Sequence, residues 1–104
     1  MEERFTPQMF VEWDAKQKGL TKEDFGVAPV VVLTWSLRTA QSMAKEIDAK
    51  ISIHWPYGER FPIYSGHIMD RPVSFAYLPV GAPGTVMMME EMIACGARIL
   101  IGLG

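Results

Sequence analysis

The last third of the chain carries the pattern that most restricts its fold. Residues 72–80 are uncharged and largely apolar, residues 81–84 are glycine, alanine or proline, residues 85–95 have the composition of a helix, and residues 98–103 are apolar after one arginine. This order predicts a strand, a tight turn, a helix and a second strand, which form a βαβ unit with parallel strands. Near-continuous apolar strands are typical of sheets that helices cover on both faces.

The middle of the chain extends the same pattern. Val27–Leu33 is uncharged and rich in β-branched residues, which predicts a central parallel strand, and Ser36 can cap the helix that follows. Ile51–Trp55 and Phe61–Met69 are the segments most like antiparallel strands, and residues 70–72 predict a tight reversal. We therefore expect a three-layer α/β fold, in which a mixed, mostly parallel sheet is flanked by helices.

Residues 1–26 are expected to form a peripheral arm on a single domain whose α/β core is residues 27–104. Thr6 and Pro7 have the order of a helix N-cap and a first helical residue, and Gly19 can end that helix. We expect this helix to pack through a face that holds Met9, Phe10, Trp13 and Lys16.

Composition and charge argue against several classes of function. The formal net charge of -2 provides no basic field for a polyanion, so we expect no nucleic-acid partner. No apolar run reaches the roughly 18 residues of a membrane-spanning helix, and no basic and apolar leader opens the chain. With 49% hydrophobic residues, 21% charged residues and one cysteine, the sequence predicts a folded cytoplasmic protein with no membrane partner.

Two features of the sequence can serve an anion. The Gly81–Thr85 turn brings backbone amides to the start of a helix, although it lacks the Gly-Lys-Ser/Thr ending of a P-loop. Arg38 lies near the start of the preceding helix, where a guanidinium can converge with backbone amides on one oxyanion. The alternatives are that the Gly81–Thr85 turn has only a structural role and that Arg38 is a solvated surface residue. Neither His54 nor His67 has a second ligand at metal spacing, so no metal site is expected.

The helix expected at residues 85–95 holds three further groups of interest. Glu90 and Glu91 are adjacent, so their side chains point in different directions and do not form an acid–base pair. We expect both carboxylates to face solvent and Cys95 to lie in the core. The packed face is expected to hold Val86, Met88, Met89, Met92 and Ile93.

Four segments carry motifs of one family in the same order. Val30–Arg38 is similar to a first strand followed by a Gly-Asp-Pro-x-Arg phosphate loop, and Gly66–Ser74 to a Gly-x-x-x-Gly-Lys/Arg-x-Val-x-Val hairpin. Leu78–Thr85 is similar to a Gly-x-Gly-x-Pro-Ser turn, and Ala94–Gly102 to a Gly-x-x-x-Ile-x-Arg-Ile/Val-Gly strand. Over residues 27–104 the chain therefore resembles the amino-terminal half of the nucleoside phosphorylase superfamily, which includes uridine and bacterial purine nucleoside phosphorylases.

The resemblance implies a nucleoside and phosphate as ligands, with phosphate as co-substrate and no cofactor. By position, Arg38 corresponds to the arginine of the family's phosphate loop, and Gly102 to the glycine at the end of its last strand. Arg60 lies in the region of an arginine that the partner subunit donates, and the glycine-rich turn contributes Gly81 and Gly84. The expected anion-binding set is therefore Arg38, Arg60, Gly81, Gly84 and Gly102, and no catalytic residue is assigned.

The chain departs from the family pattern at four positions. Thr34 and Trp35 stand where the phosphate loop has glycine and aspartate. Leu100 stands where the strand has arginine, and Leu103 where the family has serine or threonine. A leucine cannot compensate the charge of a desolvated phosphate, so these changes argue against phosphorolysis at this site.

Three functions follow from these observations. We expect the amino-terminal portion of a phosphorylase-like protein that has no turnover alone. One alternative is a nucleoside-cleaving enzyme, a phosphorylase or a hydrolytic nucleosidase, completed by further chain or by oligomerisation. The other is a non-catalytic module that binds a nucleoside or an anion. Because relatives continue beyond the last strand, the truncated sheet leaves an unpaired edge, which favours a homodimer or higher homo-oligomer.

Overall fold

The structure is a computed structural model that describes residues 6–78 and 82–103. These residues form a five-stranded mixed sheet with the strand order β2-β3-β4-β1-β5. Strands β4, β1 and β5 are parallel, whereas β3 is antiparallel to both β2 and β4. The strands are β1 (Val30–Thr34), β2 (Lys50–Ile51), β3 (Ile63–Ile68), β4 (Arg71–Tyr77) and β5 (Ile99–Leu103).

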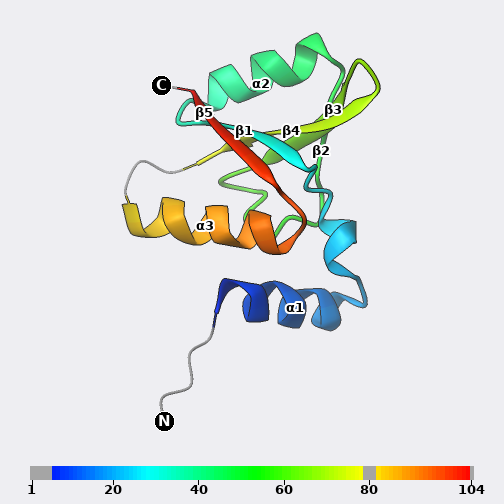
Figure 1. Cartoon of the computed structure of the whole chain (residues 1–104), viewed down its shortest axis with the longest axis vertical. Helices are drawn as coiled ribbons and strands as arrows, with labels where there is room; N and C mark the ends of the chain where they lie inside the picture. Colours follow the sequence, from blue (N-terminus) through cyan, green and yellow to red (C-terminus); the bar gives the residue numbers. More distant parts are fainter. Residues whose placement is uncertain (1–5, 79–81, 104) are drawn as a thin grey trace.

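Helices cover both faces of this sheet (Figure 1). Helix α2 packs on one face, α3 lies on the other, and α1 packs on the side of α3 that faces away from the sheet. A short 3-10 helix, η1, follows α1. The helices are α1 (Pro7–Lys18), η1 (Lys22–Phe25), α2 (Leu37–Glu46) and α3 (Ala82–Ala94). The expected α/β fold, a mixed sheet flanked by helices, is confirmed.

The starts of α1 and α2 follow the signals in the sequence. The Thr6 side chain accepts a hydrogen bond from the Met9 amide at 3.1 Å, and Gly19 ends α1 in the left-handed region with a φ of 69°. The Ser36 side chain accepts a hydrogen bond from the Thr39 amide at 3.2 Å. Each cap satisfies an amide that has no partner within its helix. Both predicted caps are confirmed, and the second fixes where α2 begins after β1.

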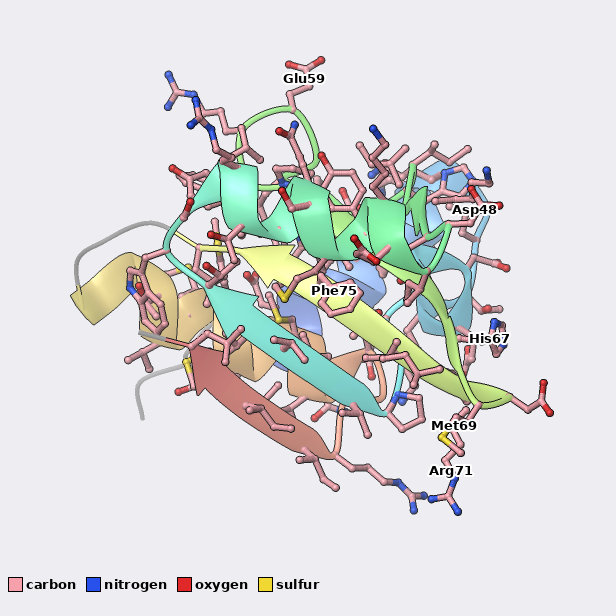
Figure 2. All side chains as sticks on the ribbon, turned by 90° about the horizontal axis from the view of Figure 1, so that it is seen from above. Asp48, Glu59, His67, Met69, Arg71 and Phe75 are labelled. Atoms are coloured by element: carbon pink, nitrogen blue, oxygen red, sulfur yellow. The ribbon has the colours of Figure 1, made fainter. Side chains whose placement is uncertain are left out.

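The hairpin between β3 and β4 turns through Met69 and Asp70. Both residues have a positive φ, 52° and 68°, as a two-residue type I′ turn requires. Such turns favour asparagine and glycine, so a methionine there stores strain. The predicted reversal at residues 70–72 lies slightly too late, because Arg71 and Pro72 already belong to β4. Met69 and Arg71 project from the tip of this hairpin (Figure 2).

Two apolar clusters fill the space between the layers. The smaller cluster joins α2 to alternate residues of β4 and β1, and it includes Phe75 (Figure 2). The larger cluster lies between the sheet and helices α3 and α1. Its buried members are Val11, Ala15, Phe25, Val31, Leu33, Trp55, Ile63, Ala76, Leu78, Met88, Met92, Cys95 and Ala97. Cys95 is therefore part of the core, as expected.

The packed face of α1 differs from the prediction. Val11 and Ala15 are its buried residues, whereas Met9, Trp13 and Lys16 are exposed. Phe10, also on the predicted face, is half-buried and packs against the larger apolar cluster. The prediction is therefore right for Phe10 and wrong for Met9, Trp13 and Lys16.

Two strand predictions also need correction. The strand expected to reach Trp55 ends at Ile51, and an irregular loop follows it. The Trp55 amide closes a turn onto the Ser52 carbonyl at 3.1 Å, and its indole N–H donates to the Phe61 carbonyl at 3.1 Å. The second correction concerns β5, which the sequence analysis expected helices to cover on both faces. Helices cover both faces of β4, whereas four of the five residues of β5 are exposed.

Three serine hydroxyls link β3 and β4 to the segment that leads into β1. Ser65 Oγ lies 2.7 Å from Ser74 Oγ and donates to the Gly26 carbonyl at 2.6 Å. Ser74 Oγ accepts a hydrogen bond from the Ala28 amide at 2.9 Å, and Ser52 Oγ lies 3.1 Å from Ser65 Oγ. This serine cluster satisfies backbone groups that would otherwise be buried without partners.

Candidate functional site

The parallel strands β4, β1 and β5 end at one margin of the sheet, here called the carboxyl edge. Their last residues, Tyr77, Thr34 and Leu103, are paired in one row. The carboxyl edge also includes Trp35–Arg38 and Gly102, and α3 begins close after the end of β4. In open α/β sheets, ligands bind in the crevice outside the carboxyl ends of the strands, so the carboxyl edge is the candidate site.

Hydrogen bonds hold the loop between β1 and α2 at the carboxyl edge. The Ser36 amide donates to Thr34 Oγ1 at 3.1 Å, and the Leu78 amide donates to the Thr34 carbonyl at 3.0 Å. Thr34 is buried, so its side chain ties the loop to the strand that precedes it. A glycine at this position could not form the first of these bonds.

Arg38 is the second residue of α2 and is exposed. Within residues 6–78 and 82–103, no carboxylate lies within ion-pair distance of its guanidinium. A guanidinium beside a helix N-terminus adds to the positive end of the helix dipole, which attracts an anion. The structure thus places Arg38 at the carboxyl edge, and its role as an anion ligand stays a prediction.

Trp35 occupies the part of the carboxyl edge next to Gly102. Two atoms of its indole ring lie 3.8 and 3.9 Å from the position that a Cβ on Gly102 would take. Gly102 shares a face of β5 with Leu100, which packs against the larger apolar cluster. The ring therefore covers the end of β5 on the α3 side. An exposed aromatic ring offers a stacking surface to a planar base and no charge to a phosphate.

The glycine-rich turn is partly helical. Helix α3 begins at Ala82, so Gly84 lies within its first turn, and the helix start expected at Thr85 is wrong. Proline is tolerated in a first helical turn because its missing amide would have no helical partner there, which explains why Pro83 does not delay the helix. Gly81 lies outside the described residues, so its predicted role is not tested.

Arg60 lies on the irregular loop between β2 and β3. Two contacts attach this loop to the end of β4. The Tyr77 amide donates to the Pro62 carbonyl at 3.2 Å, and the rings of Phe61 and Tyr77 lie 5.5 Å apart. Arg60 lines a cavity of about 760 Å³ that Arg38 does not line. In the role that the resemblance implies, Arg60 would serve a partner subunit, and this role stays a prediction.

A buried pair formed by Tyr57 and Glu91 is the main polar feature that the sequence analysis missed. The Tyr57 hydroxyl donates to Glu91 Oε2 at 3.1 Å, and Glu91 is only 2% exposed. Among the described residues, no group donates a hydrogen bond to Glu91 Oε1. Burial raises the pKa of Glu91 above its usual range, and the bond from Tyr57 offsets part of that rise. Burial, together with Glu91, also raises the pKa of Tyr57.

The position of Glu91 corrects the expected orientation of α3. The sequence analysis placed Glu91 in solvent and Val86 and Ile93 in the core, whereas Glu91 is buried and the other two are exposed. The spacing of Met88, Glu91 and Cys95 along one stripe of the helix was the signal that could have revealed this. Because Glu91 is closed to solvent, the pair is a packing feature and not an acid positioned for a substrate.

Further side-chain clusters and helices give no additional site. Within the described residues, no three histidine, cysteine, aspartate or glutamate side chains are arranged to hold a metal ion. His67 is exposed and projects outward from β3 (Figure 2). None of the described helices has both the length and the apolar character that crossing a bilayer requires.

Comparison with known proteins yields matches to solved structures. Neither a family model nor a curated protein matches this chain. Among solved structures, the chain is similar to the purine nucleoside phosphorylase of Toxoplasma gondii in complex with immucillin-H, with a TM-score of 0.65 and 24% sequence identity. The similarity covers 80% of this chain and 32% of that chain, so this chain spans about a third of the phosphorylase. The fold is therefore nucleoside phosphorylase-like, as the resemblance implied.

Proposed function

We propose that this chain is the amino-terminal portion of a nucleoside phosphorylase-like protein, and that its carboxyl edge binds a nucleoside or a small anion without turnover by the chain alone. The observation that carries this proposal is the carboxyl edge itself, in a fold shared with a nucleoside phosphorylase. There, Arg38 stands at the start of α2 with no carboxylate partner among the described residues, and Trp35 provides an exposed aromatic ring.

The residues on β5 support the proposal that the chain alone has no turnover. Leu100 packs against the larger apolar cluster, and Leu103 ends the strand beside Thr34. Neither side chain can donate a hydrogen bond to a phosphate, so Arg38 is left to neutralise the anion. Burying even a neutral polar group without a hydrogen bond costs on the order of 2–7 kcal/mol, and burying an anion costs more. Weak binding of phosphate is therefore compatible with this site, whereas a reactive phosphate is not.

Completion of the fold by more polypeptide is the second candidate. The chain covers 32% of the purine nucleoside phosphorylase that it resembles, so a full-length protein has room for the groups that bind ribose and base. Such a protein would cleave nucleosides, with phosphate as co-substrate or with water in its place. A cytoplasmic location and a homo-oligomeric state remain predictions of the sequence.

Turnover is tested by measuring free base. The purified chain is incubated with uridine, inosine and 5′-methylthioadenosine, with and without phosphate. We expect no base to be released. Release that needs phosphate would support a phosphorylase, release without phosphate would support a nucleosidase, and either result would overturn the proposal that the chain alone has no turnover.

Binding at the carboxyl edge is tested with a matched pair of arginine variants. Arg38→Met should weaken the binding of phosphate at least about tenfold, because a charge-assisted hydrogen bond contributes about 1.5–3 kcal/mol. Arg71→Met removes the same charge at the opposite end of β4 and should leave binding unchanged. Amide chemical shifts recorded during titrations with phosphate and with inosine provide the readout. Equal losses in both variants would show a general charge effect and would contradict the proposed site.

A further inference from the structure

The side chain of Tyr57 joins three parts of the fold. Tyr57 belongs to the irregular loop between β2 and β3, and its ring stacks on that of Phe10 in α1, with 6.2 Å between the ring centroids. Its hydroxyl group donates to Glu91 Oε2 of α3 at 3.1 Å. The loop, α1 and α3 therefore meet at this residue, so a change at Glu91 reaches α1 as well as α3.

Helix α1 forms a layer of its own beyond α3 (Figure 1). Its main contacts are with α3 and η1, and its two buried side chains are those of Val11 and Ala15. Proteins open locally in cooperative units, and an element that buries few apolar side chains opens at a low free energy. Helix α1 can therefore separate from α3 while the hydrogen bonds of the sheet stay in place.

The carboxyl group of Glu91 lies at this junction with incomplete hydrogen bonding. It is buried, and among the described residues no group donates to its Oε1 atom. A neutral carboxyl group tolerates such a place, whereas an ionised one needs further donors or water, since burying a charge costs far more than burying a polar group. Separation of α1 takes the Phe10 ring away from Tyr57 and opens the junction to water.

Charged and titratable groups from four parts of the fold face this junction. They are Asp14 and Lys18 of α1, Lys22 and Glu23 of η1, Tyr57 of the loop, and Cys95 of α3 itself. Asp14 and Lys18 neutralise each other through an ion pair at 2.8 Å. Within the described residues, no lysine, arginine or histidine lies within ion-pair distance of Glu91. An ionised Glu91 therefore has no cation to hold it in the closed junction.

We propose that the protonation state of Glu91 controls the docking of α1 on α3. With a neutral carboxyl group α1 stays docked, and with an ionised one, whose proton has passed to solvent, α1 separates more often. Burial raises the pKa of Glu91 above its ordinary value of 4.5, and the hydrogen bond from Tyr57 offsets part of that rise. In the open form Glu91 is solvated, so its pKa returns toward 4.5.

The direction and the size of the effect follow from these two pKa values. The open form of the chain binds the proton of Glu91 less tightly than the docked form does. The opening equilibrium of α1 should therefore rise by up to about tenfold per pH unit between the open-form and docked-form pKa values, and it should level off above the latter.

Native-state hydrogen exchange tests the proposal element by element. Exchange of the backbone amides is followed from about pH 5 to about pH 8, with each rate corrected for its intrinsic dependence on pH. We expect the opening equilibrium of the α1 amides to exceed that of the β1 and β4 amides by about tenfold or more, and to rise with pH. Low concentrations of urea should hardly change it, because a local opening exposes little surface.

Two adjacent glutamates provide a variant and its matched control. Glu91→Gln keeps the size of the side chain and an acceptor for Tyr57 but cannot ionise, so the opening of α1 should no longer depend on pH. Glu90→Gln removes the same charge from an exposed position on α3 and should keep the wild-type rise. A rise that persists in Glu91→Gln overturns the proposal. So does an equal loss in both variants, which would show an effect of net charge.

The wild-type chain gives two further outcomes that contradict the proposal. The first is an opening equilibrium of α1 that does not change with pH. The second is equal opening of the α1, β1 and β4 amides at every pH and urea concentration, because α1 would then open only when the whole chain unfolds.

Thiol labelling keeps the test decisive if Glu91→Gln does not fold. Val11→Cys on α1 and Val31→Cys on β1 each place a thiol at a fully buried valine, and Cys95→Ala removes the native thiol from both. After correction for the thiolate fraction, Val11→Cys should react about tenfold faster or more, and its rate should rise with pH. Equal rates, or a corrected Val11→Cys rate that stays flat, overturn the proposal. This inference does not depend on the proposed function.

Discussion

Removing one partner of the Tyr57–Glu91 pair should cost more than removing both. In the Tyr57→Phe variant, the buried Glu91 carboxyl group loses the one hydrogen-bond donor that the described residues give it. A buried polar group left without its partner costs about 1–3 kcal/mol, whereas apolar replacement of both partners is often nearly neutral. We therefore expect Tyr57→Phe to lower the free energy of unfolding by about 2 kcal/mol at neutral pH. Adding Glu91→Met, which continues the series of Met88 and Met92 on α3, should restore most of that loss.

The same pair makes stability depend on pH in a defined direction. Burial raises the pKa of Glu91 in the folded protein above the ordinary value of 4.5, so the folded state binds this proton more tightly than the unfolded chain does. The stability linked to this proton is complete below the unfolded-state pKa and is lost as the pH rises through the folded-state pKa. The slope for one proton is at most about 1.4 kcal/mol per pH unit.

Urea unfolding of the four members of this double-mutant cycle provides the assay. The free energy of unfolding of the wild type, minus that of Glu91→Met, should increase as the pH falls from about 8 toward about 4.5. Subtracting the variant removes the contributions of the other carboxylates, which respond to pH in both proteins. A difference that is flat or falls over this range would refute both the burial of Glu91 and its raised pKa. A coupling energy near zero between the two substitutions would refute the pairing itself.

Three further predictions concern single elements of the fold. Ser74→Ala should lower the free energy of unfolding, measured in urea, by about 1–3 kcal/mol, because it leaves the buried Ala28 amide without its acceptor. The control Ser42→Ala, on the exposed side of α2, should change it by less than about 0.5 kcal/mol. Met69→Asn combined with Asp70→Gly should raise the melting temperature, since it relieves about 0.5–1 kcal/mol of strain at two residues with positive φ, and an unchanged or lower value would argue against the type I′ turn. Burial raises the pKa of Cys95 to about 12, so its thiol should react with a disulfide reagent at neutral pH only after unfolding, and rapid reaction of the folded chain would contradict its placement in the core.

Local signals in the sequence were enough to predict the unit formed by β1 and α2. An uncharged β-branched run, a serine cap and apolar spacing all act within a few residues, so Ser36 and therefore Arg38 could be placed without knowledge of distant contacts. The parallel direction of β4 and β5 also followed from the crossover between them, whereas the place of β1 between these two strands was not predicted.

The orientation of α3 could not be predicted, because most of its residues are apolar and the periodic signal is weak. Its buried face was decided by contacts from far along the chain, with α1 packing on it and Tyr57 supplying a partner for Glu91. The candidate site shows the same limit. Family motifs suggested Gly102, but the contact of Trp35 with the end of β5 depends on how two distant segments meet.

The strand order also matters while the chain is being made. Strand β1 lies between β4 and β5, and both of these neighbours follow it in the sequence. As the first half of the polypeptide leaves the ribosome, the apolar side chains of Val31 and Leu33 therefore have neither neighbouring strand to pack beside. The centre of the sheet can assemble only when residues 99–103 have emerged, which makes late, cooperative folding and a need for protection of the nascent chain the natural outcome of this topology.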